Sequence, residues 1–272
     1  AHQTYSCTCT QVIPDTPGQT NKKPVPIPIN LALYGKRGQE IILNLKGKDC
    51  DSRTKEMVIN FSNAKEIFTF TDIHEEPVPS ILRGFSAPVN LNIEYSIDEM
   101  IFLMANDNDP FNRWNITRKL LSDTVLSLVE DIQQNRMLEV DYQIIEAFQK
   151  ALLNPNINKE LTALALTVPS ESELGDLVSI IDVDAIHTAR EFLMNTIANQ
   201  LKDNFREIFE TNQENGPYQI DQGSIAKRCI KNLALTYLSH IKSSDHKTDS
   251  FVFDVFKSTN NMTDEIAALS VL

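Results

Sequence analysis

The stretch Ser96-Ile97-Asp98-Glu99 marks the point at which the hydrophobic pattern of the chain changes. It is a capping box, in which a serine and a glutamate three residues later each accept a backbone N–H at the start of a helix. From Ser96 onward, apolar residues recur at steps of three and four, the period of a helix with one buried face. We therefore expect helices after this stretch and a different structure before it.

Residues 1–92 show the two-residue period that is typical of strands. The predicted strands, separated by turn signals, lie at 5–12, 25–34, 40–45, 56–61 and 66–70. Pro24, Pro26 and Pro28 occupy alternate positions, which predicts an edge strand or the approach to one, because proline lacks the N–H that a sheet needs. The pattern indicates a small antiparallel β-sandwich of the Ig-like kind.

Residues 93–272 are predicted to be entirely helical. Asp109-Pro110 supplies an N-cap followed by proline at the first helical position, and Ser170 with Glu173 forms a second capping box. Further helices are expected over 110–134, 141–153, 158–167, 184–212, 222–242 and 249–258, with a last one starting at Thr263. About seven helices in succession with no intervening strand favour a superhelical or solenoid-like domain, although no sequence repeat of fixed length is found.

Charge and composition narrow the function classes. The net charge is −12, and residues 91–272 carry 15 basic against 28 acidic side chains, so a nucleic-acid partner is not expected. No apolar run approaches the roughly 18 residues that span a bilayer, and the first thirty residues lack a signal-peptide pattern. We expect a soluble chain whose four cysteines are reduced.

Both ends of the chain resemble cuts. The chain opens without Met inside the alternating run that begins at Tyr5, and the helix at Thr263 has a start signal but no stop signal. We therefore expect an excised part of a longer protein. A stack of helices interrupted in this way is expected to expose an apolar face and to self-associate.

No zinc-peptidase motif is found. The H-E-x-x-H pattern places two histidines on one helix face, but His74-Glu75 is followed by Pro77 and ends in Val78. His187 and Glu191 are one helical turn apart and lack a third ligand, so a surface or interhelical hydrogen-bond pair is the better interpretation. His2, His240 and His246 look isolated.

Other candidate sites have structural explanations. Cys7 and Cys9 should lie on one face of a strand, where a relaxed disulfide is awkward, and a metal or redox role is the weaker interpretation. Asp49, Asp51 and the run Asp107-Asn108-Asp109 lack calcium-loop spacing, and the run is better explained as a helix cap. No nucleophile elbow or phosphate-binding glycine loop occurs, so the residues alone predict no catalytic, cofactor-binding or metal-binding side chain.

Several collinear stretches nonetheless resemble one family. Pro77-Val-Pro-Ser-Ile-Leu-Arg-Gly-Phe-Ser-Ala-Pro-Val89 is similar to the passage between the sandwich and the helical domain of bacterial-type aminopeptidase N, the alanyl aminopeptidases of the gluzincin zinc peptidases. Further stretches resemble that family in the right order: Lys23 to Ile29, Phe111 to Trp114, Leu166 to Ser170, Ser224 to Leu235 and Asn260 to Leu269.

The resemblance implies a four-domain parent, of which this chain looks like the β-sandwich and the first half of the helical C-terminal domain. Zinc and catalysis would belong to the parent, because neither H-E-x-x-H nor the amine-binding G-x-M-E-N motif is present here. The implied role is to wall the active-site chamber and gate access of peptides, in the cytoplasm, with the other domains of the polypeptide as partners. The chain alone should be inactive.

Two alternatives stay open. One is an interaction scaffold, a sandwich with a helical repeat that binds peptides or partner helices and has no enzymatic parent. The other is an independent enzyme with an unrecognised site, for which His187, Glu191 and His74 would be the first residues to test.

Overall fold

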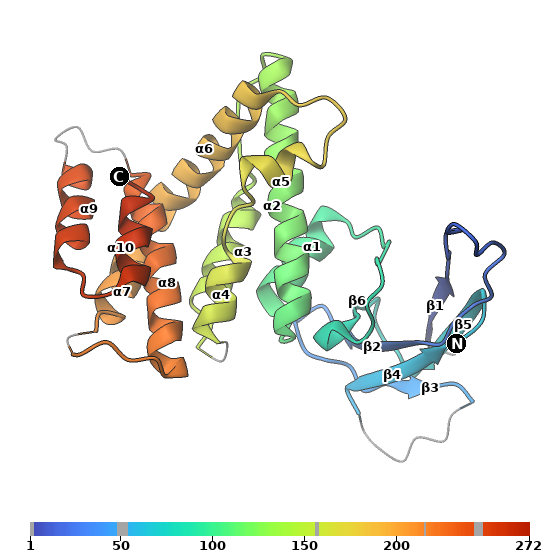
Figure 1. Cartoon of the computed structure of the whole chain (residues 1–272). Coiled ribbons are helices and arrows are strands. Elements are labelled where there is room, and N and C mark those ends of the chain that lie inside the picture. Colours follow the sequence, from blue (N-terminus) through green and yellow to red (C-terminus); the bar gives the residue numbers. More distant parts are fainter. Residues whose placement is uncertain (1–2, 48–53, 156–157, 215, 242–246) are drawn as a thin grey trace. The chain divides into compact units, whose positions relative to one another are not determined.

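The computed structural model describes residues 3–47, 54–155, 158–214, 216–241 and 247–272 (Figure 1). The chain divides into two compact units, Ala1–Arg113 and Trp114–Leu272. All strands belong to the first unit and most helices to the second. The predicted domain boundary between residues 92 and 93 stays a prediction.

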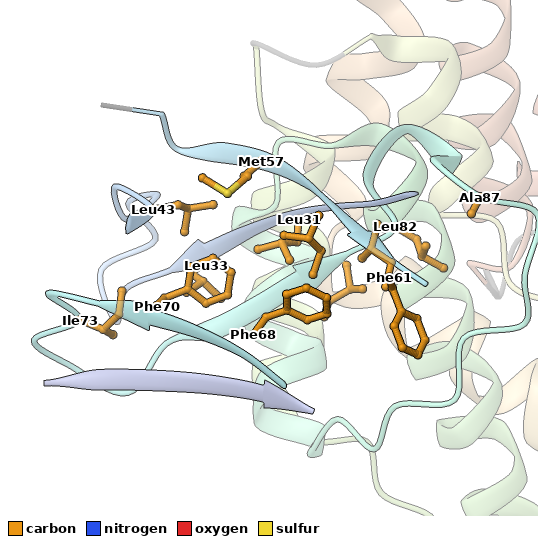
Figure 2. Close-up of a cluster of buried hydrophobic side chains, with 13 residues drawn as sticks. Leu31, Leu33, Leu43, Met57, Phe61, Phe68, Phe70, Ile73, Leu82 and Ala87 are labelled. Atoms are coloured by element: carbon orange, nitrogen blue, oxygen red, sulfur yellow. The ribbon is translucent and has the colours of Figure 1, made fainter. Parts of the chain in front are cut away.

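The first unit contains two three-stranded antiparallel sheets. Their strand orders are β1 (Thr4–Thr10), β5 (Lys65–Thr71), β3 (Asn44–Leu45) and β4 (Glu56–Phe61), β2 (Ile27–Tyr34), β6 (Val78–Ile81). Inward and outward side chains alternate along β4, where Met57, Ile59 and Phe61 are buried. They meet Phe68 and Phe70 of β5 in the core that Figure 2 shows. The expectation of an antiparallel Ig-like sandwich is confirmed.

The structure agrees only in part with the prediction from the proline pattern. β2 is the central strand of its sheet, so the prediction of an edge strand is wrong for most of its length. Pro24 and Pro26 precede β2, and Pro28 lies beside β4 alone, because β6 pairs only with residues 31–34. The edge strand that does contain proline is β6, with Pro79, which was not predicted as a strand.

Helix starts in the first unit follow the predicted caps. After the short 3₁₀ helix η1 (Arg83–Phe85), α1 (Ile97–Asn106) begins with the capping box: Glu99 N donates to Ser96 Oγ over 3.2 Å and Ser96 N to Glu99 Oε2 over 2.8 Å. At the start of α2 (Pro110–Gln133), Asn112 N donates to Asp109 Oδ1 over 2.7 Å, which confirms Asp109 as the N-cap.

The second unit contains helices joined by loops and no strand among its described residues. After α2 it contains α3 (Tyr142–Leu152), α4 (Lys159–Ala165), α5 (Glu171–Gly175), α6 (Val183–Gln200), α7 (Lys202–Thr211), α8 (Gln222–Ser239), α9 (Lys247–Ser258) and α10 (Met262–Leu269). No helix in the described part of the chain combines the length and apolarity needed to cross a bilayer. The predicted all-helical domain is confirmed as an arrangement of repeats.

Two helix boundaries differ from the prediction. The single helix expected over 184–212 is two helices, because Leu201 has φ −111° and ψ 22° and ends α6 while its side chain stays buried. The last helix is capped by Asn261, whose side chain accepts the N–H of Asp264 over 3.0 Å, and not by Thr263. Both residue types make good caps, so the sequence alone does not separate them.

An aromatic cluster holds three helices of the second unit together. Phe205 of α7 stacks on Tyr237 of α8 with ring centroids 4.6 Å apart, and Phe148 of α3 meets both rings edge-on. The buried Tyr237 hydroxyl donates to the Leu166 carbonyl over 2.9 Å, which also ties the end of α4 to α8. Edge-on and stacked ring pairs add to the stabilisation from burial.

The last helix exposes an apolar stripe. Met262, Ile266 and Leu269 lie at helical spacing on α10 and are each more than half exposed. We expect the chain to self-associate through this stripe, with light scattering at high concentration giving a mass above that of one chain. Ile266→Glu with Leu269→Glu should restore the single-chain mass, whereas Val12→Glu, at an exposed site in the first unit, should not. A wild-type monomer at high concentration would contradict this expectation.

Candidate functional site

The His-Glu pair of the first unit forms no metal site. His74 is exposed, and its Nδ1 contacts the side-chain oxygen of Gln3. Glu75 is engaged elsewhere: it accepts the backbone N–H of Lys36 over 3.1 Å and the side-chain amide of Gln39 over 2.9 Å. The two side chains therefore serve separate loop contacts.

His187 and Glu191 each have a partner on another segment of the second unit. His187 Nδ1 lies 2.7 Å from Glu171 Oε1 of α5, and this carboxylate raises the pKa of His187. Glu191 Oε2 lies 3.3 Å from Nδ1 of His240, which follows α8. The expectation that His240 is isolated is therefore wrong. Burial lowers the pKa of His240. His187 and Glu191 therefore belong to two separate pairs, His187 with Glu171 and Glu191 with His240.

No metal site is found elsewhere among the described residues, because no group of three or more His, Cys, Asp or Glu side chains could hold an ion. Asp49 and Asp51, which were considered for calcium, lie outside the described residues, as do Cys50, His2 and His246.

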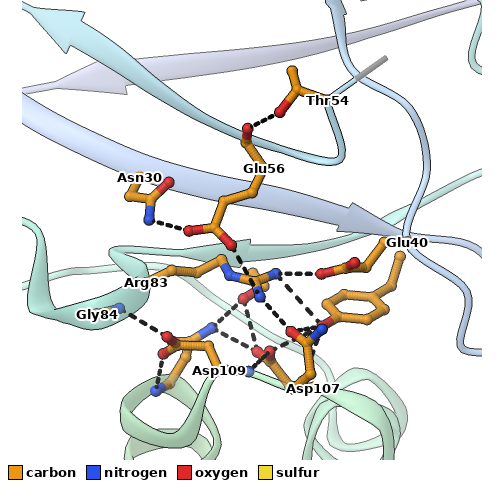
Figure 3. Close-up of polar contacts among 12 residues, drawn as sticks. Asn30, Glu40, Thr54, Glu56, Arg83, Gly84, Asp107 and Asp109 are labelled. Carbon is orange, nitrogen blue, oxygen red and sulfur yellow. Dashed lines mark hydrogen bonds and ion pairs between the residues drawn. The ribbon is translucent and has the colours of Figure 1, made fainter. Parts of the chain in front are cut away.

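A cluster of ionisable and polar groups surrounds a buried arginine (Figure 3). The Arg83 side chain, at the start of η1, is 4% exposed, and its Nη1 lies 3.0 Å from Glu40 Oε1. Its Nη2 lies 3.4 Å from Glu56 Oε2 and also donates to the side-chain oxygen of Asn108. Because a buried guanidinium needs charged and polar partners, these contacts determine where Arg83 can sit.

Asp107 is the second centre of this polar cluster. It is 1% exposed, and it accepts hydrogen bonds from Ser80 Oγ at 2.7 Å, Asn112 Nδ2 at 2.9 Å and the Tyr34 hydroxyl at 3.1 Å. Burial raises the pKa of the Asp107 carboxyl, against the lowering effect of the hydrogen bond from Ser80. Burial likewise raises the pKa of the Tyr34 hydroxyl.

The polar cluster holds neighbouring segments in place and does not have the features of a catalytic site. Its members hydrogen-bond mainly to one another, and the cavities beside His74 and beside Cys7 are lined by other residues. It joins β2, β6 and η1 to the end of α1 and the start of α2. The predicted helix cap explains Asp109, but it does not predict that Asn108 accepts a hydrogen bond from Arg83 or that the Asp107 charge acts on Arg83. The one available signal is that Arg83 is the only charged residue in the stretch 77–89.

Removing the buried cation should destabilise the first unit strongly. Arg83→Met leaves the carboxylates of Glu40 and Asp107 without their counter-charge, and we expect a loss of about 3–5 kcal/mol. Arg136→Met removes an exposed pair with Asp131 and should cost less than about 1 kcal/mol. Hydrogen exchange of the β2 and β6 amides measures the loss in Arg83→Met, whereas Arg136→Met, in the second unit, should leave their protection unchanged. Equal protection in the two variants would contradict the assignment.

A groove opens between the two sheets at one edge of the sandwich. It has a volume of about 760 Å³ and is lined by β1, the start of β2, the ends of β4 and β6, and residues 89–93. Cys7 and Cys9 of β1 face it with their Sγ atoms 3.9 Å apart. The predicted placement of both thiols on one strand face is confirmed.

Comparison with known proteins assigns both parts of the chain. Residues 1–94 match the family described as "Domain of unknown function (DUF3458) Ig-like fold". Residues 97–272 match "Domain of unknown function (DUF3458_C) ARM repeats". The chain belongs to the DUF3458_C family. The second match covers most of the chain, and the first adds the DUF3458 sandwich in front of it.

This DUF3458_C chain is similar to aminopeptidases. It is 35% identical over 266 residues to aminopeptidase N of Escherichia coli (strain K12) and 33% identical over 268 residues to that of Haemophilus influenzae, covering 98% of this chain in each case. The crystal structure of Legionella pneumophila aminopeptidase A in complex with aspartic acid matches with a TM-score of 0.76 at 25% identity over 98% of this chain. The resemblance to aminopeptidase N is confirmed. The chain spans about 30% of the length of these relatives.

Proposed function

We propose that this chain is a non-catalytic segment of a zinc-dependent aminopeptidase that removes N-terminal residues from peptides. The observation that carries the proposal is the collinear similarity to aminopeptidase N over 98% of the chain, in the order sandwich then helical repeat. The chain corresponds to only 30% of that relative, so the remaining domains of one polypeptide are its first partners. We place the division of the two domains at residues 92 and 93.

Zinc and the reacting groups belong, in this proposal, to the rest of the parent. A catalytic zinc site needs three protein ligands and an open position. The described residues do not fit that requirement, because their histidines are engaged in separate pairs with Gln3, Glu171 and Glu191. We therefore assign no catalytic, cofactor-binding or metal-binding residue for peptide hydrolysis to this chain.

The part that the chain plays would be steric and electrostatic. A sandwich followed by stacked helices can wall a chamber that admits peptides and excludes folded proteins. The excess of 28 acidic over 15 basic residues in 91–272 would favour substrates with a cationic amino terminus. A cytoplasmic parent that acts on peptides is the setting that we propose for this role.

The first test is hydrolysis of an alanyl or leucyl chromogenic amide by the purified chain with added zinc, together with metal content after dialysis. We expect no turnover and no stoichiometric zinc, because the proposal places both in the parent. Turnover that tracks bound zinc would contradict the proposal, and His187→Gln, Glu191→Gln and His74→Gln would then locate the site. A parent without a zinc motif would instead support the interaction scaffold.

A second test concerns the acidic helical part in the full-length parent. The combined variant Asp184→Asn, Glu207→Gln, Glu210→Gln removes three exposed negative charges from α6 and α7. We expect a several-fold higher KM for peptides with a cationic amino-terminal residue at low salt, with kcat unchanged. The matched control is the same measurement at high salt, where screening should abolish the difference. An unchanged KM at low salt would remove the electrostatic part of the proposal.

A further inference from the structure

The two thiols in the groove form a preorganised pair. Cys7 and Cys9 are two residues apart on β1, so their side chains leave the same face of the strand. Pairing of all seven β1 residues with β5 holds this stretch extended. The Sγ atoms are 3.9 Å apart, both side chains are half-buried, and both face the groove of about 760 Å³. The sheet therefore fixes two sulfurs side by side at an accessible cavity.

The same extended backbone disfavours a disulfide. A disulfide needs its sulfurs about 2.05 Å apart and its Cα atoms usually within about 6.8 Å. Residues two apart in an antiparallel strand are separated by about 6.8 Å, at the upper limit of that range. The observed Sγ separation of 3.9 Å is that of two free thiols. Forming the Cys7–Cys9 disulfide would require β1 to bend and break hydrogen bonds with β5.

The sulfur separation does suit chelation of a metal ion. With metal–sulfur bonds of about 2.3 Å, sulfurs 3.9 Å apart subtend an angle of about 116° at the ion. That angle lies between the trigonal and tetrahedral values, so neither side chain has to move far.

The surrounding residues limit which ion fits. Zinc sites use at least three protein ligands, and no such group of His, Cys, Asp or Glu is found among the described residues. Glu66, the cross-strand partner of Cys9, accepts hydrogen bonds from Ser62 N and Asn63 Nδ2 instead. Thiolates select soft ions, among which Cu(I) accepts low coordination numbers. The groove is also lined by apolar side chains, including Ile27, Phe61 and Ile93.

We propose that Cys7 and Cys9 form a bis-thiolate site for Cu(I), with a remaining coordination position open to the groove. Binding forms two Cu–S bonds and releases the two thiol protons to solvent, and copper stays in the Cu(I) state throughout. The site is separate from the proposed peptidase role and does not depend on it.

The test is titration of the reduced full chain with Cu(I) under anaerobic conditions against the chromophoric chelator bicinchoninate. We expect one copper per chain to be withdrawn from the chelator. Cys7→Ser and Cys9→Ser should each weaken binding more than the 10–100-fold that loss of an outer-shell partner costs. Cys229→Ser is the matched control, because this half-exposed thiol on α8 lies in the other unit and should not affect binding.

Two results would overturn the proposal. One is retention of all copper by the chelator, and the other is binding that survives in the Cys7→Ser, Cys9→Ser double variant, which would locate the copper elsewhere. If the variants fail to fold, X-ray absorption of copper-loaded wild-type chain decides instead. Coordination with two sulfurs supports the site, whereas a shell of nitrogen and oxygen alone refutes it.

Discussion

Burial of the Arg83 guanidinium is the constraint on which the first unit depends. A cation that is almost fully removed from water must be matched by partners in fixed positions, and here they come from separate segments: Glu40 after β2, Glu56 at the start of β4 and Asn108 before α2. Asp107 extends the same network to Ser80 of β6 and Tyr34 of β2. The sandwich and the first helices are therefore aligned by polar contacts with defined geometry, while the apolar core of the sheets provides the free energy of folding.

The second unit is held together mainly by packing of aromatic rings and by a buried ion pair. Its core relies on ring packing of Phe148, Phe205 and Tyr237, and one buried ion pair joins α8 to α10. Lys231 Nζ lies 2.6 Å from Asp264 Oδ2, and Asn261 both caps α10 and donates to that carboxylate over 2.8 Å. One carboxylate therefore satisfies both the buried cation and the helix cap, and this shared group helps to fix α10 against α8.

Local signals in the sequence predicted local structure well. The capping box at Ser96 and the Asp109-Pro110 pair are complete within a few residues, so α1 and the start of α2 could be placed without knowing the fold. The strand status of 78–81 and the central position of β2 could not, because they depend on which strands pair across the sheet. The break at Leu201 was hidden because its apolar spacing continues through both helices. Within the polar cluster, only the Asp109 cap could be predicted from the sequence. Arg83 contacts partners that lie 25 or more residues away in the chain, and a local pattern does not predict such contacts.

The spacing of Cys7 and Cys9 on β1 argues against a disulfide and in favour of a metal site. Alternation along a strand predicts that Cys7 and Cys9 share a face, and the spacing of two residues argues against a disulfide. From sequence that argument leaves the pair without a role. The structure adds a sulfur separation of 3.9 Å and a groove beside it, neither of which follows from the spacing alone. A backbone that resists oxidation to a disulfide keeps both sulfurs available as ligands, so the feature that weakened a redox role is the one that favours metal binding.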